Sequence, residues 1–240
     1  MEQIEPYVDS RHSGLCIHCG VLLNKLNASR DHVPSKCLLL LPPPAQSPKV
    51  WICKTCNNQF SIDEQYLAAF LGCVLSGSTE PSRQSIPAMK QILQENELLR
   101  LRIEKSRIEV RMPDGTMSCK WLPEIERINK VVIKNARGHA FFEYGEQIQG
   151  EPSSVWALPL MLLTNEQRAD FEGSNSGPSF AAWPEVGSRM MTRVVTGQDL
   201  VDSWIVLQEG VYRYAVEQQE RMLVKTVLYE YLATEVCWMN

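Results

Sequence analysis

Apolar side chains recur at helical spacing in three segments of the chain, and each segment predicts an amphipathic helix. The first helix is expected over about 62–75, because Ser61 and Glu64 have the spacing of a capping box just before the apolar stripe. The second is expected over about 85–105. The third is expected over about 123–144, where a glycine follows the last apolar position.

The C-terminal part of the chain has the alternation of strands. Residues 204–207, 211–216 and 222–229 are rich in β-branched and aromatic side chains, and connections of hairpin length separate them. These residues predict a three-stranded antiparallel meander. Thr164 and Gln167 form another capping box, which predicts a short helix before the meander. The whole pattern predicts an α+β fold.

Composition suggests three domains or regions. A linker at 76–86 separates an N-terminal module, 1–77, from a helical region, 78–148, and an α+β accessory domain is expected over 149–240. The 240 residues, 44% hydrophobic and 22% charged, are typical of a globular protein. No apolar run approaches the roughly 20 residues of a membrane helix. The acidic N-terminus has no apolar core of a secretory signal. We therefore expect a cytoplasmic protein that makes no contact with a membrane.

Charge is distributed unevenly along the chain. The total is −4, but residues 1–75 are neutral, residues 76–137 carry +4 and residues 138–240 carry −8. A negative total argues against a non-specific nucleic-acid binder. The acidic C-terminal part argues against a DNA-binding surface there. For residues 150–240, a surface that binds a protein partner or forms a homo-oligomer is as plausible as a DNA-binding one.

Cations recur on one side of the third predicted helix, at spacings of three, four and three residues. They are Arg127, Lys130, Lys134 and Arg137. Such a row either follows a nucleic-acid backbone or forms an ordinary solvated face. His139 falls on the apolar side of the same helix and is interpreted as a core or boundary histidine.

Eight cysteines include two C-x-x-C pairs, formed by Cys16 with Cys19 and by Cys53 with Cys56. Each pair offers two thiolates from one tight turn, and two such turns complete a tetrahedral zinc site. The alternatives are a coincidence or a redox pair, but a redox pair is expected in a βαβ context that the sequence lacks. Four thiolates leave no open position, so the zinc is expected to be structural. The unpaired cysteines are interpreted as small buried apolar residues: Cys37, Cys73, Cys119 and Cys237.

Candidate catalytic and metal-binding residues lie between and just after the two C-x-x-C pairs. A predicted β-hairpin carries Asp31 and His32, which Val-Pro follows, and Asn57 comes directly after the second pair. This order resembles the HNH endonucleases of the ββα-metal, or His-Me finger, type with two cysteine knuckles. The resemblance covers roughly residues 14–75, and it implies a hairpin and a helix that carry a nuclease site.

The resemblance also implies roles for individual residues. His32 matches the general base of the family, and Asp31 and Asn57 match the ligands of a catalytic Mg²⁺ or Mn²⁺ ion. Asn58 and Glu64 are possible additional ligands, while Glu64 has the alternative role of a capping partner. Residues 33–56 contain no asparagine where the family has a central one, so another group must orient His32.

The resemblance thus implies a metal-dependent endonuclease that hydrolyses phosphodiester bonds in DNA, and by analogy with the family a role in phage defence, restriction or a mobile element. The alternative is a zinc module with a decayed site that binds nucleic acid or a protein partner. No Gly-rich phosphate loop, G-x-S-x-G or H-E-x-x-H motif supports a different enzyme.

Overall fold

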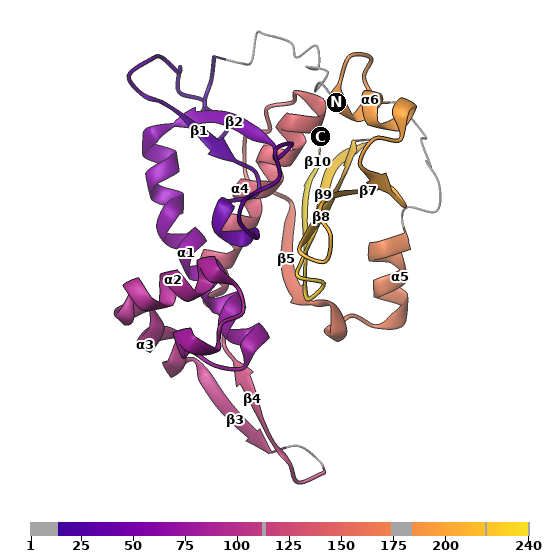
Figure 1. Ribbon diagram of the computed structural model, residues 1–240. Helices are drawn as coiled ribbons and strands as arrows, with labels where there is room; N and C mark the ends of the chain where they lie inside the picture. The colour runs from indigo at the N-terminus through magenta and orange to yellow at the C-terminus, as the bar shows by residue number, and fades with distance from the viewer. Residues whose placement is uncertain (1–13, 112–113, 174–183, 219, 240) are drawn as a thin grey trace.

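The computed structural model describes residues 14–111, 114–173, 184–218 and 220–239. Residues 1–13, whose composition argued against a secretory signal, lie outside this part of the chain. The described residues form six α-helices and three antiparallel sheets, which confirms the α+β class (Figure 1). None of the described helices is both long and apolar enough to span a membrane.

The N-terminal part consists of a hairpin followed directly by a long helix. Strands β1 (Ala28–His32) and β2 (Lys49–Cys53) pair antiparallel, and α1 (Lys54–Ser76) begins at the next residue. The predicted helix start near residue 62 is therefore wrong. The sulfur of Cys53 caps α1 by accepting a hydrogen bond from Cys56 N, whereas Ser61 Oγ donates to Asn58 O inside the helix. Between the strands, a short 3₁₀ turn, η1, spans Lys36–Leu38.

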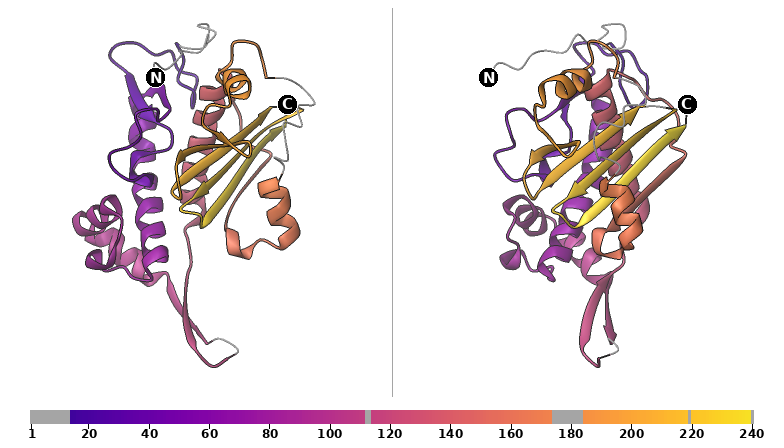
Figure 2. Two further views of the ribbon diagram at one scale, coloured as in Figure 1. Left: turned by 45° about the vertical axis from the view of Figure 1, so that its right-hand side comes forward. Right: turned by 90° about the vertical axis from the view of Figure 1, so that its right-hand side faces the viewer.

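A helical pair and a second hairpin follow. The predicted helix over 85–105 is two helices, α2 (Pro87–Glu95) and α3 (Glu97–Lys105), preceded by η2 (Pro81–Arg83). The break lies at Asn96, whose side chain accepts a hydrogen bond from Leu99 N and so caps α3. Strands β3 (Arg107–Arg111) and β4 (Met117–Trp121) form a hairpin that projects away from the body of the molecule (Figures 1 and 2).

The C-terminal sheet is larger than the predicted meander. Its strand order is β5-β10-β9-β8-β7-β6, and all its pairs are antiparallel. The prediction found β7, β8 and β9 but missed the other three strands. The bounds are β5 (Ser154–Pro159), β6 (Leu200–Val201), β7 (Trp204–Gln208), β8 (Tyr212–Gln218), β9 (Arg221–Leu228) and β10 (Leu232–Met239). Connecting helices are η3 (Leu160–Leu162), α5 (Asn165–Gly173), which the Thr164–Gln167 capping box starts, and α6 (Arg189–Thr196).

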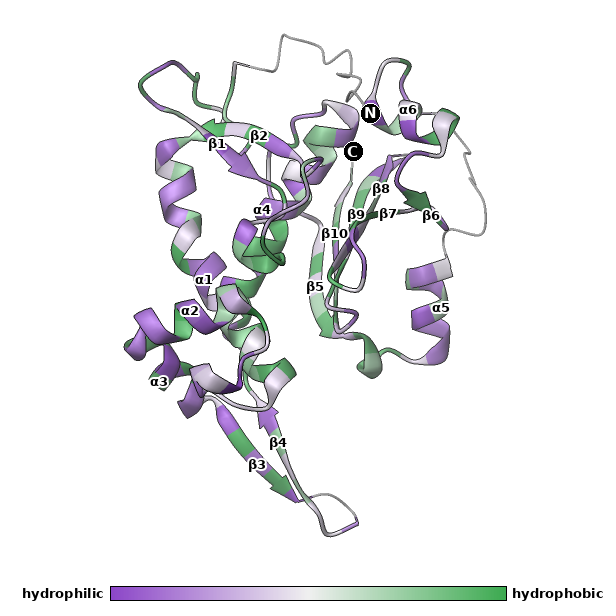
Figure 3. Cartoon of the chain, viewed as in Figure 1, coloured by the Kyte–Doolittle hydropathy of each residue, from purple (hydrophilic) through white to green (hydrophobic). Residues whose placement is uncertain are grey.

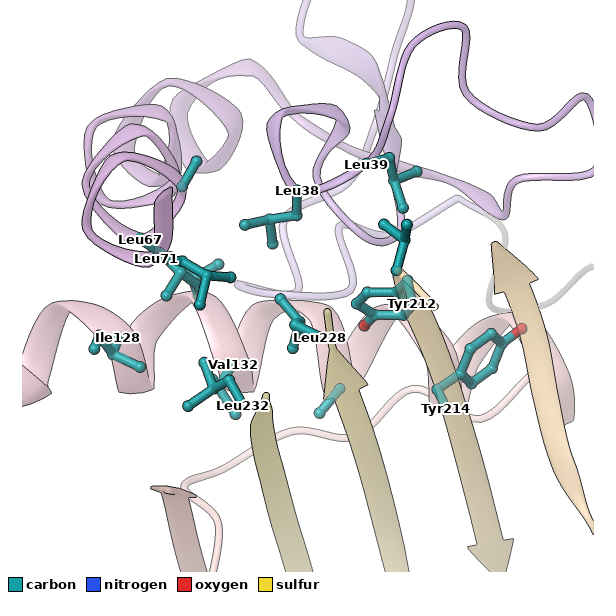
Figure 4. Close-up of a cluster of buried hydrophobic side chains, with 14 of the residues drawn as sticks. Leu38, Leu39, Leu67, Leu71, Ile128, Val132, Tyr212, Tyr214, Leu228 and Leu232 are labelled. Atoms are coloured by element: carbon teal, nitrogen blue, oxygen red, sulfur yellow. The ribbon is translucent and has the colours of Figure 1, made fainter. Parts of the chain in front are cut away.

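Helix α4 (Ile125–Tyr144), which agrees with the third predicted helix, lies between α1 and the sheet (Figure 2). Side chains from α1, η1, α4 and the sheet meet in one apolar core, of which Figure 4 shows the central part. Figure 3 shows that hydrophobic residues concentrate on the sheet strands, while α3 and α5 are mostly hydrophilic. The core takes residues from all three predicted segments, so these segments are packed together as one body.

Helix α4 passes close to the turn that follows β1. A Cβ atom added to Gly138 would lie 2.5 Å from Cγ2 of Val33, so only glycine allows this approach. Val33 is fully buried, and its amide donates to Pro48 O at 2.9 Å. The turn after His32 is therefore held between its own hairpin and a helix that is distant in sequence.

A buried polar cluster joins the C-terminal half of α4 to the sheet. His139 is fully buried, as predicted; its Nε2 lies 2.9 Å from the hydroxyl of Tyr212, and its ring stacks on Tyr214. Glu143, also fully buried, accepts hydrogen bonds from Arg193 and from the hydroxyl of Tyr214. Burial, with the charge of Arg193 next in size, lowers the pKa of His139 well below its usual value.

We expect the stability of the protein to fall as the pH drops from 6.5 to 5. The unfolded chain binds a proton at His139 below pH 6.5 whereas the folded chain does not, so acid favours unfolding. Denaturant unfolding at pH 7.5 and 5.0, at fixed zinc, should show a smaller pH difference for His139→Phe than for the wild type. Equal pH differences would contradict a neutral buried His139.

Candidate functional site

Four cysteines gather at one end of the β1–β2 hairpin. Cys16 and Cys19 lie in a tight turn before β1, in which Gly20, with φ of +69°, donates from its amide to Cys16 O at 2.8 Å. Cys53 is the last residue of β2, and Cys56 lies in the first turn of α1. The two C-x-x-C pairs are therefore brought together by the hairpin and the start of the helix.

The geometry of this cluster fits a zinc ion. The four sulfur atoms all lie within 4.8 Å of one another, and the Cys19 and Cys53 sulfurs are 3.7 Å apart. Tetrahedral zinc with Zn–S bonds of about 2.3 Å places its sulfurs about 3.8 Å apart. These four side chains can therefore hold zinc, as the spacing predicted.

The other cysteines have no part in this cluster. Cys73 and Cys237 are buried, as predicted, and Cys37 is half-buried. Cys119 is exposed on β4, where it accepts hydrogen bonds from Arg107, so the prediction that it is buried is wrong.

A buried lysine joins the hairpin to α1 beneath the predicted catalytic residues. Lys134 of α4 is 1% exposed, and its Nζ lies 2.8 Å from Oδ2 of Asp31 and 2.5 Å from Oε1 of Glu64. Ser35 Oγ lies 3.1 Å from the same nitrogen and donates to Glu64 at 2.7 Å. Burial raises the pKa of Asp31, and the charge of Lys134 opposes this effect. One ammonium group thus compensates two carboxylates of low exposure.

Side chains of α1 and α4 support the turn after His32. Ser35, which is buried, links this turn to Glu64, and Asn135 of α4 lies beside it with Oδ1 at 3.5 Å from Ser35 Oγ. The predicted capping role of Glu64 is wrong, because its carboxylate contacts Ser35 and Lys134 rather than the start of a helix. The supporting groups come from α1 and α4.

His32 lies at the end of β1 and is partly exposed. Its pKa is lowered to about 4, first by burial and then by the surrounding cations Lys36, Lys49, Lys134 and Arg30. Its imidazole is therefore neutral at pH 7 and can accept a proton.

An open pocket of about 310 Å³ lies over this hairpin and α1. Asp31, His32, Asn57 and Glu64 all line it, together with Arg30, Ser35, Lys36, Cys37, Ser61 and Gln65. The amide nitrogen of Asn57 donates to Ser29 Oγ at 3.0 Å, so its oxygen is the atom available to a cation. Asn58 is exposed and does not line the pocket. Three of the residues singled out for chemistry, and Glu64, thus border one cavity.

The predicted row of cations on α4 does not form a free surface. Lys134 has no exposed side chain to offer a phosphate, so its assignment as a backbone contact is wrong. Arg127 lies over the ring of Tyr66 and pairs with Asp63 at 2.5 Å, and Arg137 donates to Gly150 O. Lys130 remains largely exposed, 4.0 Å from a carboxylate oxygen of Asp63.

Sequence reasoning missed the part that Lys134 and Ser35 play. A signal was present, because Lys134 lies three residues after Val131 and four before Gly138, on the face of α4 that packs against the hairpin. A charged residue at such positions is buried with its partners.

In comparisons with known proteins, no family model, no curated protein and no solved structure matches this chain.

Proposed function

We propose that this protein is a metal-dependent endonuclease that hydrolyses phosphodiester bonds in DNA. The observation that carries the proposal is the pocket that a neutral histidine, a carboxylate and an asparagine all line, in a hairpin that also carries a four-cysteine cluster able to hold a structural zinc ion. The resemblance to the HNH endonucleases concerns these same residues. A role in phage defence, restriction or a mobile element remains part of the proposal.

The chain supplies the groups that this reaction requires. Oxygens of Asp31 and Asn57 would hold a hard divalent cation such as Mg²⁺ or Mn²⁺, for which carboxylate and amide oxygens are suitable ligands. When bound, the cation would stabilise negative charge on the phosphate and on the leaving oxygen. His32 would take a proton from the attacking water, since its imidazole is neutral at pH 7. Lys134 and Ser35 hold Asp31 and the turn after His32 from below.

Purified protein is expected to cleave single-stranded DNA, and to nick supercoiled plasmid where its strands are unpaired, in the presence of Mg²⁺ or Mn²⁺. His32→Ala should lower the rate by about 100- to 10,000-fold. Asn57→Ala should also lose cleavage, whereas Asn58→Ala, the exposed neighbour, should keep it. Zinc content and the unfolding temperature of each variant show that it is folded. Cleavage that persists in His32→Ala would exclude this histidine as the base.

A second function is a non-catalytic zinc module that binds nucleic acid or a protein partner. It is favoured by the contact of Lys134 with Asp31, since one oxygen of the proposed metal ligand already pairs with a cation. A folded, zinc-loaded wild type that cleaves neither plasmid nor single-stranded DNA under any metal condition would support this alternative.

A further inference from the structure

The outward face of the β1–β2 hairpin carries His32 together with other polar and aromatic side chains. Arg30 is paired with Trp51, and His32 with Lys49, so all four project from the same face of the two strands. Asp31, on the opposite face, is buried with the adjacent residues of β2. The hairpin therefore has one side packed against the body and one side turned to solvent.

This outward face is locally basic. Arg30 and Lys49 are exposed, as is Lys36 in the turn beyond His32. Within the described part of the chain, no carboxylate forms an ion pair with any of these three residues. We call Arg30, Lys36 and Lys49 the cationic rim. The positive charge of this rim, which lies beside the pocket, is complementary to the negative charge of a phosphate backbone.

Trp51 supplies the second feature of this surface. Its side chain is 50% exposed, and the guanidinium carbon of Arg30 lies 5.8 Å from its ring centroid. An exposed indole beside cations is the usual platform for an unpaired nucleobase, because every base has a face that stacks on an aromatic ring. The bases of an intact duplex are stacked on each other and are not accessible to such a platform.

We propose that the hairpin face binds a single-stranded polynucleotide, with phosphates on the cationic rim and one unpaired base on Trp51. This inference rests on the proposed function for the position of the cleaved phosphate, which would lie at the His32 pocket. It names the substrate class as an unpaired strand. It also assigns the nucleic-acid contacts to the hairpin rather than to α4.

Binding is tested apart from cleavage, in the His32→Ala background and without added divalent metal. The probes are fluorescein-labelled oligothymidine, oligouridine and a mixed-sequence duplex, each 20 nucleotides or base pairs long, measured by fluorescence anisotropy. The oligothymidine and oligouridine arms distinguish DNA from RNA as the source of the strand. At least one single strand should bind more tightly than the duplex.

Variants of the cationic rim and of Trp51 separate the contribution of the cations to the binding affinity from that of the indole ring. Arg30→Ala, Lys36→Ala and Lys49→Ala together should lower the affinity at least tenfold and reduce the slope of log K against log salt by about 2. Trp51→Ala should weaken binding about 5- to 150-fold, and Trp51→Phe should retain most of the affinity. A control with Lys90→Ala, Lys120→Ala and Lys130→Ala removes three other exposed lysines and should change little.

The outcomes distinguish this inference from the proposed function. Binding that depends on the rim and Trp51, in a protein that never cleaves, would support the inference and refute the nuclease. Cleavage by a protein whose rim and Trp51 variants bind and cut like the wild type would refute the inference alone. A duplex bound as tightly as either single strand would also overturn it.

Discussion

Cys19→Ser is expected to remove zinc from the protein and to lower its unfolding temperature by more than about 8 °C. Three of the seven buried residues in the small apolar cluster of the N-terminal hairpin are the cysteines Cys16, Cys53 and Cys56. Without the metal this part of the chain has little other apolar core. Structural zinc contributes about 10–16 kcal/mol in small zinc domains. A loss of several kcal/mol in the free energy of unfolding is therefore expected, which gives the stated shift for a chain of this size.

The chain offers a matched control in Cys119→Ser. Cys19 and Cys119 are both exposed, so the exchange of sulfur for oxygen should be equally harmless in the absence of metal. Zinc measured by mass spectrometry should be one ion per chain in the wild type and in Cys119→Ser, and absent from Cys19→Ser. If Cys19→Ser keeps both its zinc and its unfolding temperature, the four-cysteine site is not structural.

Lys134→Met is expected to destabilise the protein by about 3–5 kcal/mol, as is usual when one partner of a buried ion pair is removed. The substitution leaves the carboxylates of Asp31 and Glu64 near each other, at low exposure and without their shared cation. Lys130→Met, one turn earlier on α4, removes an exposed ammonium 4.0 Å from Asp63 and should cost less than about 1 kcal/mol. Denaturant unfolding of the two variants measures the difference.

A second substitution tests the charge explanation directly. Adding Glu64→Gln to Lys134→Met removes one of the two uncompensated carboxylates, so the double variant should be more stable than Lys134→Met alone. In the wild-type background Glu64→Gln leaves Lys134 paired with Asp31 and should be mildly destabilising. A double variant less stable than Lys134→Met would show that packing of the lysine side chain, rather than its charge, is the source of the effect.

Local patterns in the sequence predicted much of the site. The two C-x-x-C pairs and the hairpin with Asp31 and His32 depend on neighbouring residues, and the structure contains both. The pattern misplaced the start of α1 because Cys53 provides the cap through its sulfur. This cap is local, but cysteine is not among the usual capping residues, so the pattern gave no signal of it.

Long-range contacts were the part that the sequence could not reveal. Strand β5 pairs with β10 across the whole C-terminal region, and periodicity says nothing about which strands are neighbours. Lys134 was interpreted as one of four similar cations, but only packing of α4 against the hairpin separates it from Lys130. No residue of α4 lines the pocket, but Lys134 pairs with two of its lining residues, Asp31 and Glu64.

The position of Lys134 also has a consequence for how the protein is made. The ribosome releases Asp31 and Glu64 long before Lys134, which follows Asp31 by 103 residues. Until α4 emerges and docks, a nascent chain has the hairpin and α1 but lacks the ammonium group that compensates their carboxylates. A chain cut short before this helix cannot assemble the complete site. The buried ion pairs next to the pocket are therefore completed only after more than half of the polypeptide has been synthesised.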